Sequence, residues 1–165
     1  MKSVHLIRHA KSSWDHPGLA DRARPLSQRG HRDTRIMAHA MHEAGVVFDH
    51  VLCSVAQRAQ LTIQGVAEHW PGRPIDWQLH ESLYTFSASA IWSLVRALTD
   101  DQQVVFLVGH NPAFTDFVNQ ASAAGLANVP TCAYAHVSFT QATQWQEVVA
   151  GTAELAAFMK PKMFK

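Results

Sequence analysis

Four side chains suited to phosphoryl transfer occur at three separate points of the chain. Arg8 and His9 follow the apolar run Val4 to Ile7, Arg58 lies fifty residues further on, and His110 follows a second apolar run. A neutral imidazole can attack phosphorus and form a phosphoramidate that water later cleaves, which divides one difficult substitution into two easier ones. His9 is therefore the expected nucleophile. Arg8 and Arg58 are the expected phosphate-binding residues, because arginine stays charged and binds phosphate oxygens through two donors at once.

His110 is expected to complete this pocket as a hydrogen-bond donor to the same phosphate oxygens. Two arginines and a second histidine would then surround the transferred group, so the chemistry requires no metal and no other cofactor. Each residue taken alone has a simpler reading. Arg58 could be a solvated helix residue, His9 a structural histidine, and His110 a hydrogen-bonding partner of a turn. Only their joint occurrence favours catalysis.

The elements that would position these residues alternate along the chain. Short apolar runs predict strands, and longer stretches with helical periodicity predict helices. Ser27 is a candidate helix cap and Gly45 a candidate helix end. Expected strands are 4–7, 51–53, 75–79 and 104–108, with a late pair at 133–140 and 145–149, and expected helices are 27–44, 54–68, 87–98 and 114–121.

This alternation predicts a three-layer α/β/α fold with a mainly parallel central sheet. In open sheets of this kind, ligands bind beyond the carboxyl ends of the strands. Arg8-His9, the segment Ser54 to Arg58, and Gly109-His110-Asn111 each follow an expected strand. The three segments are therefore expected to meet at one edge of the sheet.

Several motifs, in order along nearly the whole chain, resemble the histidine phosphatase superfamily, which has a phosphoglycerate mutase-like fold, and most closely its SixA-type phosphohistidine phosphatase branch. The matching segments are Leu6 to Trp14, Arg24-Pro25-Leu26 with Gly30, Cys53-Ser54 with Arg58, Glu81 to Tyr84, Val108 to Pro112, and Pro130-Thr131. The resemblance implies the same phosphate-binding role for His110. Two departures are Ala10, where many members have glycine, and Val55-Ala56-Gln57, where proline and a further basic residue are expected.

Other candidate site residues are less strongly indicated. Family members that act on phosphate esters generally use a carboxylate to protonate the leaving oxygen, and Glu81, after the third expected strand, is the candidate general acid; it could equally be a helix-capping or surface residue. Phosphohistidine has a labile P–N bond and could dispense with such an acid. Candidate substrate-binding residues are Ser12, Ser13, Asn111 and Trp14, the last as part of the pocket wall.

The length of the chain limits the substrate. Larger superfamily members insert a helical lid beside the pocket, but the stretch between Arg58 and His110 is already filled by one expected strand and two helices. An open site with a minimal lid suits a phosphohistidine held out on a partner protein. The alternatives are a phosphomonoesterase that acts on a small phosphorylated metabolite, and an inactive phosphate-binding module.

The composition limits the number of domains and the classes of partner. The 165 residues, 47% of them hydrophobic, predict a single domain over 1–165. The 14 basic residues are dispersed and the net charge is only +1, which argues against a nucleic-acid partner. Two separated cysteines, no signal peptide and no apolar span of membrane length indicate a cytoplasmic protein without membrane contact. His39, His42 and Glu43 share a predicted helix, but they lack a metal-binding motif and are interpreted as a solvated face.

Overall fold

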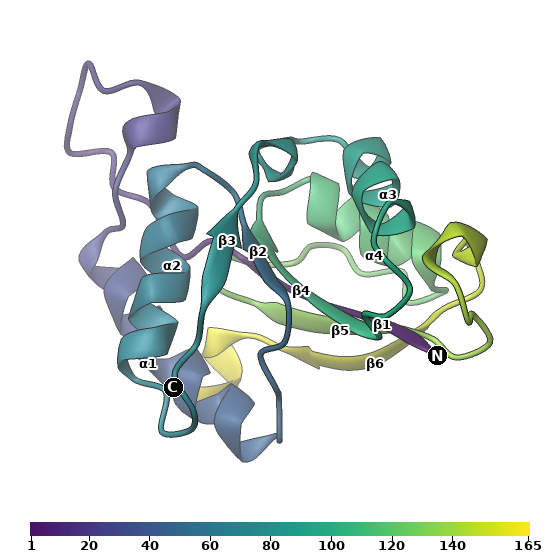
Figure 1. Ribbon diagram of the computed structural model, residues 1–165. Coiled ribbons are helices and arrows are strands. Elements are labelled where there is room, and N and C mark those ends of the chain that lie inside the picture. Colours follow the sequence, from purple (N-terminus) through teal and green to yellow (C-terminus); the bar gives the residue numbers. More distant parts are fainter.

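The computed structural model describes residues 1–165, and its strands form one six-stranded sheet in the order β3-β2-β4-β1-β5-β6 (Figure 1). The first four of these strands run parallel, β5 is antiparallel to β1, and β6 is antiparallel to β5. The strands are β1 (Lys2–Arg8), β2 (Val51–Cys53), β3 (Trp77–Leu79), β4 (Val104–Gly109), β5 (Tyr134–Phe139) and β6 (Glu154–Met159). The helices are α1 (Gln28–Glu43), α2 (Gln57–Glu68), α3 (Ala88–Arg96) and α4 (Ala113–Ala121), with 3₁₀ turns η1 (Asp21–Ala23), η2 (Glu81–Leu83), η3 (Trp145–Glu147) and η4 (Pro161–Phe164).

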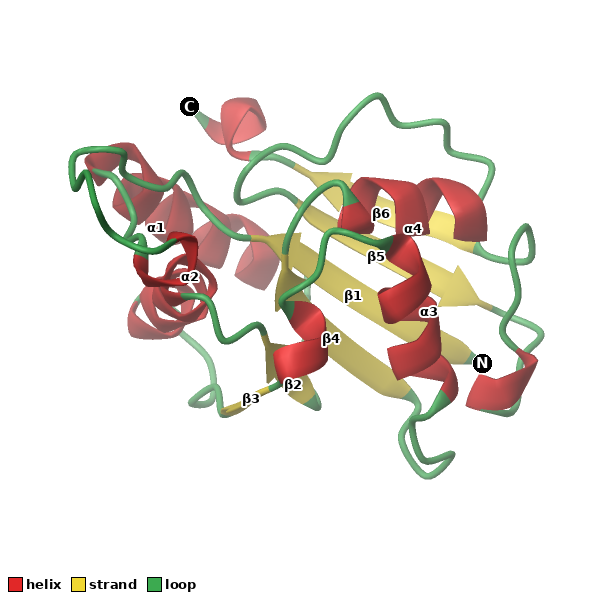
Figure 2. Cartoon of the chain, turned by 90° about the horizontal axis from the view of Figure 1, so that it is seen from above, coloured by secondary structure: helices red, strands yellow, loops and turns green.

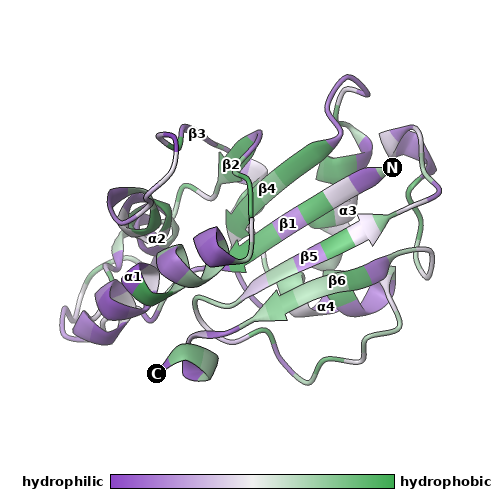
Figure 3. Cartoon of the chain, turned by 90° about the horizontal axis from the view of Figure 1, so that it is seen from below, coloured by the Kyte–Doolittle hydropathy of each residue, from purple (hydrophilic) through white to green (hydrophobic).

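Helices cover both faces of the sheet, as the sequence predicts. Successive side chains of a strand point to opposite faces, and β1 divides in this way between two cores. Leu6 packs with α3 and α4, whereas Ile7 packs with α1 and α2. Figure 2 shows the two helix pairs on opposite sides of the strands. Figure 3 shows that β1 and β4 are largely hydrophobic and that most of α1 is hydrophilic. The fold is the expected three-layer α/β/α arrangement.

The boundaries of α1 follow from local chemistry. The Ser27 side chain accepts a hydrogen bond from the Gly30 backbone N–H, which caps the helix. At its other end, Gly45 has φ +79°, a left-handed conformation that favours glycine. Gly30 also allows a close approach, because a Cβ there would overlap the carbonyl oxygen of Lys11. The loop that follows β1 is thus packed directly against the first turn of α1.

Several predicted elements differ from the structure. The second helix begins at Gln57 and not at Ser54, because residues 54–56 form a non-helical connection from β2, with Ala56 in an extended conformation. The third strand begins at Trp77 and not at residue 75. No strand occurs at 145–149. Trp145 is instead fully buried in a 3₁₀ turn, where its indole N–H donates to the Gln102 carbonyl oxygen, and the last strand is β6, which the sequence did not predict.

None of the helices combines the length and the apolar character needed to cross a lipid bilayer.

Candidate active site

The carboxyl ends of three parallel strands lie side by side and deliver the predicted site residues. Arg8 at the end of β1 is paired with Gly109 at the end of β4, and Cys53 at the end of β2 is paired with Val108. The pairing of β1 with β4 extends one residue further, because the His9 backbone N–H donates to the Gly109 carbonyl oxygen at 2.9 Å. The expected convergence of the three segments is therefore present in the fold.

The imidazole of His9 is held in one tautomer. Its Nδ1 lies 2.8 Å from the carbonyl oxygen of Ala10. A carbonyl oxygen can only accept a hydrogen bond, so Nδ1 carries the proton and Nε2 keeps a free lone pair. The residue is 8% exposed, and its ring centroid lies 5.3 Å from that of His110. The geometry thus prepares Nε2 of His9 to act as a nucleophile.

The surroundings also favour the neutral form of His9. Burial is the main cause that lowers its pKa, and the nearby His110, Arg58 and Arg8 lower it further. The hydrogen bond to Ala10 acts in the opposite direction, but the pKa still falls to about 3. His9 is therefore uncharged over the physiological pH range, as attack on phosphorus requires.

His110 is also buried and neutral. Its Nε2 lies 2.7 Å from the Ser54 hydroxyl, and its Nδ1 lies 3.5 Å from Nη2 of Arg58. A guanidinium group can only donate, so Nδ1 is the acceptor and Nε2 carries the proton. Burial and then Arg58 lower the pKa of His110 to about 4. Donation from Nδ1 to a phosphate oxygen, the expected role, requires His110 to take up a proton.

Arg8 is half-buried and lacks an anionic partner. One of its amino groups donates to the Val129 carbonyl oxygen at 3.0 Å, and its buried Nε has no hydrogen-bond partner. Burial and the nearby charge of Arg58 lower the pKa of Arg8. Two guanidinium groups that repel each other beside His9 form a site in which an anion is electrostatically favoured.

Arg58, in the first turn of α2 and only 3% exposed, is paired with a residue that the sequence did not single out. Its Nη2 lies 3.0 Å from a carboxylate oxygen of Asp21, and its Nη1 donates to the Asp21 carbonyl oxygen at 2.8 Å. The Tyr84 hydroxyl donates to the same carboxylate oxygen, and the Tyr84 ring lies 5.4 Å from the His110 ring. Asp21 lies in a long loop without periodicity, so the sequence carried no signal for it, whereas Tyr84 belonged to a matching motif without an assigned role.

Glu81 occupies a different position from the one expected of a general acid. It lies in η2 beyond the end of β3, and its side chain is 74% exposed. Both of its carboxylate oxygens accept from Nη2 of Arg22, at 2.7 and 2.8 Å. The carboxylate that pairs with Arg58 is that of Asp21, whereas Glu81 pairs with Arg22.

The four candidate substrate-binding residues have partners within the protein. Ser12 accepts from Arg24, and the Ser13 hydroxyl accepts from the Asp15 backbone N–H. The side-chain amide of Asn111 donates to the carbonyl oxygen of Val129 and accepts from the Thr115 backbone N–H, so it links the loop after β4 to α4. Trp14 is 73% exposed, and the Arg24 guanidinium lies 3.3 Å from its ring centroid. These residues shape the loops around the site.

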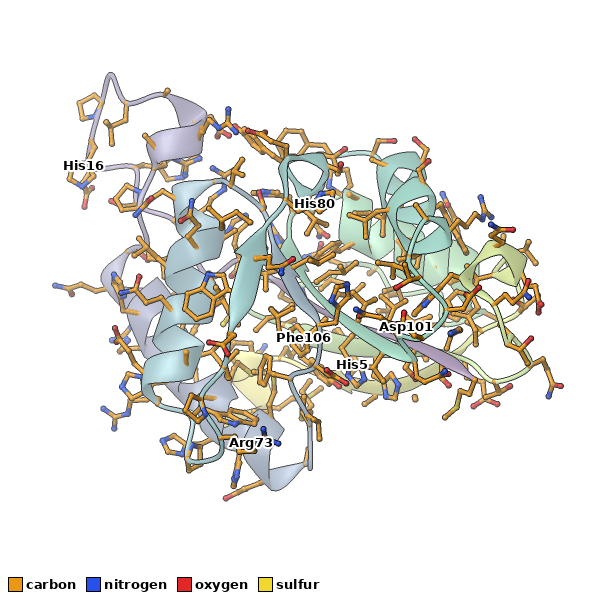
Figure 4. All side chains as sticks on the ribbon, in the orientation of Figure 1. His5, His16, Arg73, His80, Asp101 and Phe106 are labelled. Carbon is orange, nitrogen blue, oxygen red and sulfur yellow. The ribbon has the colours of Figure 1, made fainter.

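Other candidate sites lie elsewhere. No group of three or more His, Cys, Asp or Glu side chains is arranged to hold a metal ion, and His42 packs edge-on against Trp70. A cavity of about 580 Å³ is lined by residues that precede β2 and β3 in the chain, among them Phe48, Trp70 and Arg73. It therefore lies at the opposite edge of the sheet from His9. Figure 4 shows Arg73 far from His80, which follows β3 at the catalytic edge.

Comparison with known proteins agrees with this geometry. The model of the histidine phosphatase superfamily (branch 1) matches residues 4–91, just over half of the chain. An uncharacterized protein of Mycobacterium leprae is 28% identical over 94% of this chain and 100% of its own length. The structure of the protein histidine phosphatase SixA complexed with tungstate has a TM-score of 0.80 at 22% identity, covering 99% of both chains. A protein of Agrobacterium tumefaciens, provisionally described as the phosphohistidine phosphatase SixA, has a TM-score of 0.78 at 26% identity, covering 97% of this chain and 99% of its own.

Proposed function

The chain belongs to the histidine phosphatase superfamily, and from this premise we propose that it removes phosphate from phosphohistidine on a partner protein, through an intermediate carried on His9. That the protein is a phosphatase follows from its family. The nucleophile, the phosphate-binding residues and the phosphohistidine substrate are the proposal. SixA-type proteins among its structural neighbours support this choice of substrate.

The observation that carries the proposal is that Nε2 of His9 is free and that two arginine side chains lie near the same ring. Arg8 has an unpartnered Nε, and the guanidinium groups of Arg8 and Arg58 repel each other. A phosphoryl group bound between them would satisfy the unpartnered donor, relieve this repulsion and place phosphorus within reach of His9. His110 would be the third phosphate ligand.

The two steps balance without an added acid. His9 Nε2 attacks phosphorus, the P–N bond of a protonated phosphohistidine breaks, and the electron pair stays on the leaving nitrogen as neutral imidazole. The phosphorylated His9 keeps its Nδ1 proton, which continues to donate to Ala10. Water then attacks phosphorus, orthophosphate leaves with both protons of that water, and Nε2 regains its lone pair.

The size of the loops around the site supports a protein-borne substrate. Between Arg58 and His110 the chain forms only the remainder of α2, then β3, η2, α3 and β4, so this stretch contains no additional helical lid. A side chain that projects from a partner protein could reach such a site. We also infer that Ser12, Ser13 and Asn111 contribute to substrate binding, that Trp14 forms part of the pocket wall, and that the protein works in the cytoplasm.

The decisive experiment compares the wild type with His9→Ala on a phosphohistidine-containing protein, with phosphotyrosine and sugar phosphates as competing substrates. The wild type should release phosphate with the highest kcat/KM from phosphohistidine, and His9→Ala should lose at least about a thousandfold of that activity. Acid-labile phosphate should be trapped on the wild-type chain and not on the variant.

His136→Gln is the matched control, because it replaces a histidine on the sheet outside the site. This variant should keep the wild-type activity, and acid-labile phosphate should still be trapped on its chain. Equal activity of the wild type and His9→Ala would rule out the covalent mechanism, and a higher kcat/KM on a sugar phosphate would replace phosphohistidine with a small metabolite.

A further inference from the structure

The carboxylate of Asp21 is an unusual neighbour for a phosphate site. It is 49% exposed and comes from η1, in the loop between β1 and α1, yet it pairs at 3.0 Å with the buried guanidinium of Arg58. It is also close enough to His110 to influence the pKa of that histidine. Asp21 thus places a solvent-exposed carboxylate beside both Arg58 and His110.

Asp21 is poorly suited to donate a proton. The Tyr84 hydroxyl, followed by Arg58 and Arg24, holds the pKa of this carboxyl below its usual range. An ionised carboxylate accepts hydrogen bonds and cannot protonate a leaving oxygen. It would also repel the negative charge that develops on the oxygen of a phosphate ester during cleavage.

The other carboxylate near this edge does not replace it. Glu81 is occupied by Arg22 in an exposed ion pair and contacts neither Arg58 nor His110. The site therefore combines a nucleophile and a phosphate cradle with a fixed negative charge at its mouth. This combination opposes a leaving group that becomes anionic, and it favours a donor that is cationic while bound and leaves as a neutral imidazole.

We propose that Asp21 selects the leaving group: its carboxylate accepts the ring N–H of a protonated phosphohistidine and disfavours phosphate esters. This inference rests on the proposed function and adds a specificity-determining residue to it. In the transfer step, the P–N bond breaks and its electron pair stays on the imidazole, whose N–H remains hydrogen-bonded to Asp21. No proton moves, so the carboxylate stabilises the protonated donor without acting as an acid.

The test uses two small substrates with different leaving groups, phosphoimidazole and phenyl phosphate, with spontaneous hydrolysis subtracted. Asp21→Asn keeps the shape of the side chain and removes its charge. It should lower kcat/KM for phosphoimidazole by about tenfold, because a charge-assisted hydrogen bond becomes a neutral one. For phenyl phosphate, kcat/KM should stay the same or rise, so the ratio of the two should fall at least about tenfold.

A second measurement separates this role from a structural one. If Asp21 only positioned Arg58, Asp21→Asn would lower kcat/KM for both substrates in parallel and weaken competitive inhibition by inorganic phosphate. Under the proposal, inhibition by phosphate is unchanged or stronger, because a negative charge has been removed beside the anion. Asp101→Asn, an exposed aspartate at the opposite edge of the sheet, is the matched control and should change neither ratio nor inhibition.

The outcomes distinguish this inference from the proposed function. A wild type that releases no phosphate from phosphoimidazole or phosphohistidine contradicts the proposed function itself. A wild type that is active on both, together with an unchanged substrate ratio in Asp21→Asn, overturns only the role of Asp21. If the melting temperature of Asp21→Asn is much lower than that of the wild type, Asp21→Ser is measured in its place, with the same two substrates and the same inhibition by phosphate. An unchanged ratio of kcat/KM values in Asp21→Ser would likewise overturn the role of Asp21.

Discussion

At the scale of single residues, the site depends on which nitrogen of each histidine carries a proton. His9 donates from Nδ1 to the Ala10 carbonyl oxygen, and His110 donates from Nε2 to Ser54. The two rings therefore present opposite nitrogens as acceptors. A backbone carbonyl selects the tautomer of His9 and the Arg58 guanidinium selects that of His110, and burial keeps both rings neutral.

The pH dependence of catalysis follows from the protonation state of His9. Its pKa is lowered from 6.5 to about 3, so the neutral, nucleophilic form is fully populated above about pH 5. We expect kcat/KM of the free enzyme, corrected for ionisation of the substrate, to show no loss near pH 6.5 as the pH falls from 8 to 5. A stopped-assay pH profile checks this, and a decline centred near pH 6.5 would contradict it.

The four residues that the sequence predicted to meet, and that the fold brings together, share one property. Arg8, His9, Arg58 and His110 follow or begin regular elements, so the apolar runs and helical periodicity around them are enough to place all four at the same sheet edge. Asp21 could not be found in this way, because its position depends on how a long loop folds back onto α2. Its contacts with Arg58 and Tyr84 join residues that are 37 and 63 positions apart.

At the scale of elements, one buried side chain connects the nucleophile loop to α2. The Thr62 hydroxyl accepts from the Ala10 backbone N–H at 2.8 Å and donates to the Arg58 carbonyl oxygen at 2.7 Å. Thr62 is completely buried. It thus joins the segment that holds His9 to the helical turn that holds Arg58.

Thr62→Val should therefore affect both stability and activity. Valine has the shape of threonine but leaves the Ala10 N–H buried without a partner, which costs about 1–3 kcal/mol of unfolding free energy. We expect urea denaturation to show this loss and kcat to fall as the His9 loop shifts. Thr62→Ser keeps the hydroxyl and should retain most of kcat; a Thr62→Val protein as active and as stable as the wild type would show that the link is unimportant.

The errors in the predicted elements also have a physical cause. Residues 145–149 are as apolar as a strand, but their large side chains fill the core beside α3, as the burial of Trp145 and Val148 shows. β6 was missed because, as an edge strand, it is only partly buried and has weak alternation. Apolar content identified the core, but it could not distinguish a strand from a turn that contributes large side chains.

At the scale of the whole molecule, a second group of histidines lies within the sheet, away from the catalytic edge. His5 on β1 stacks on His136 of β5, with 4.0 Å between the ring centroids, and Nδ1 of His5 lies 2.6 Å from the Tyr134 hydroxyl. Figure 4 shows His5 next to Phe106. Burial and then His136 lower the pKa of His5 to about 4, and burial lowers that of His136.

These shifts give the stability of the protein a defined pH dependence. Histidines with lowered pKa values in the folded state are protonated more readily when the chain is unfolded. Their contribution is fully present above pH 6.5 and is lost as the pH falls from 6.5 through about 4. We expect the melting temperature to be constant above pH 7 and to decrease between pH 6.5 and 4. His5→Gln should make this decrease shallower, and an identical slope would exclude His5 as a cause.

The position of β1 in the sheet order has a consequence for synthesis of the chain. The first strand lies between β4 and β5, and its pairs join Ser3 to Val104 and Lys2 to Phe139. A ribosome must therefore translate most of the protein before the segment that precedes His9 can find either neighbour. Residues 4–91 carry the family motif together with His9 and Arg58, but a nascent chain of that length lacks both strands that flank β1. The proposed nucleophile is thus made early and is among the last residues to be enclosed.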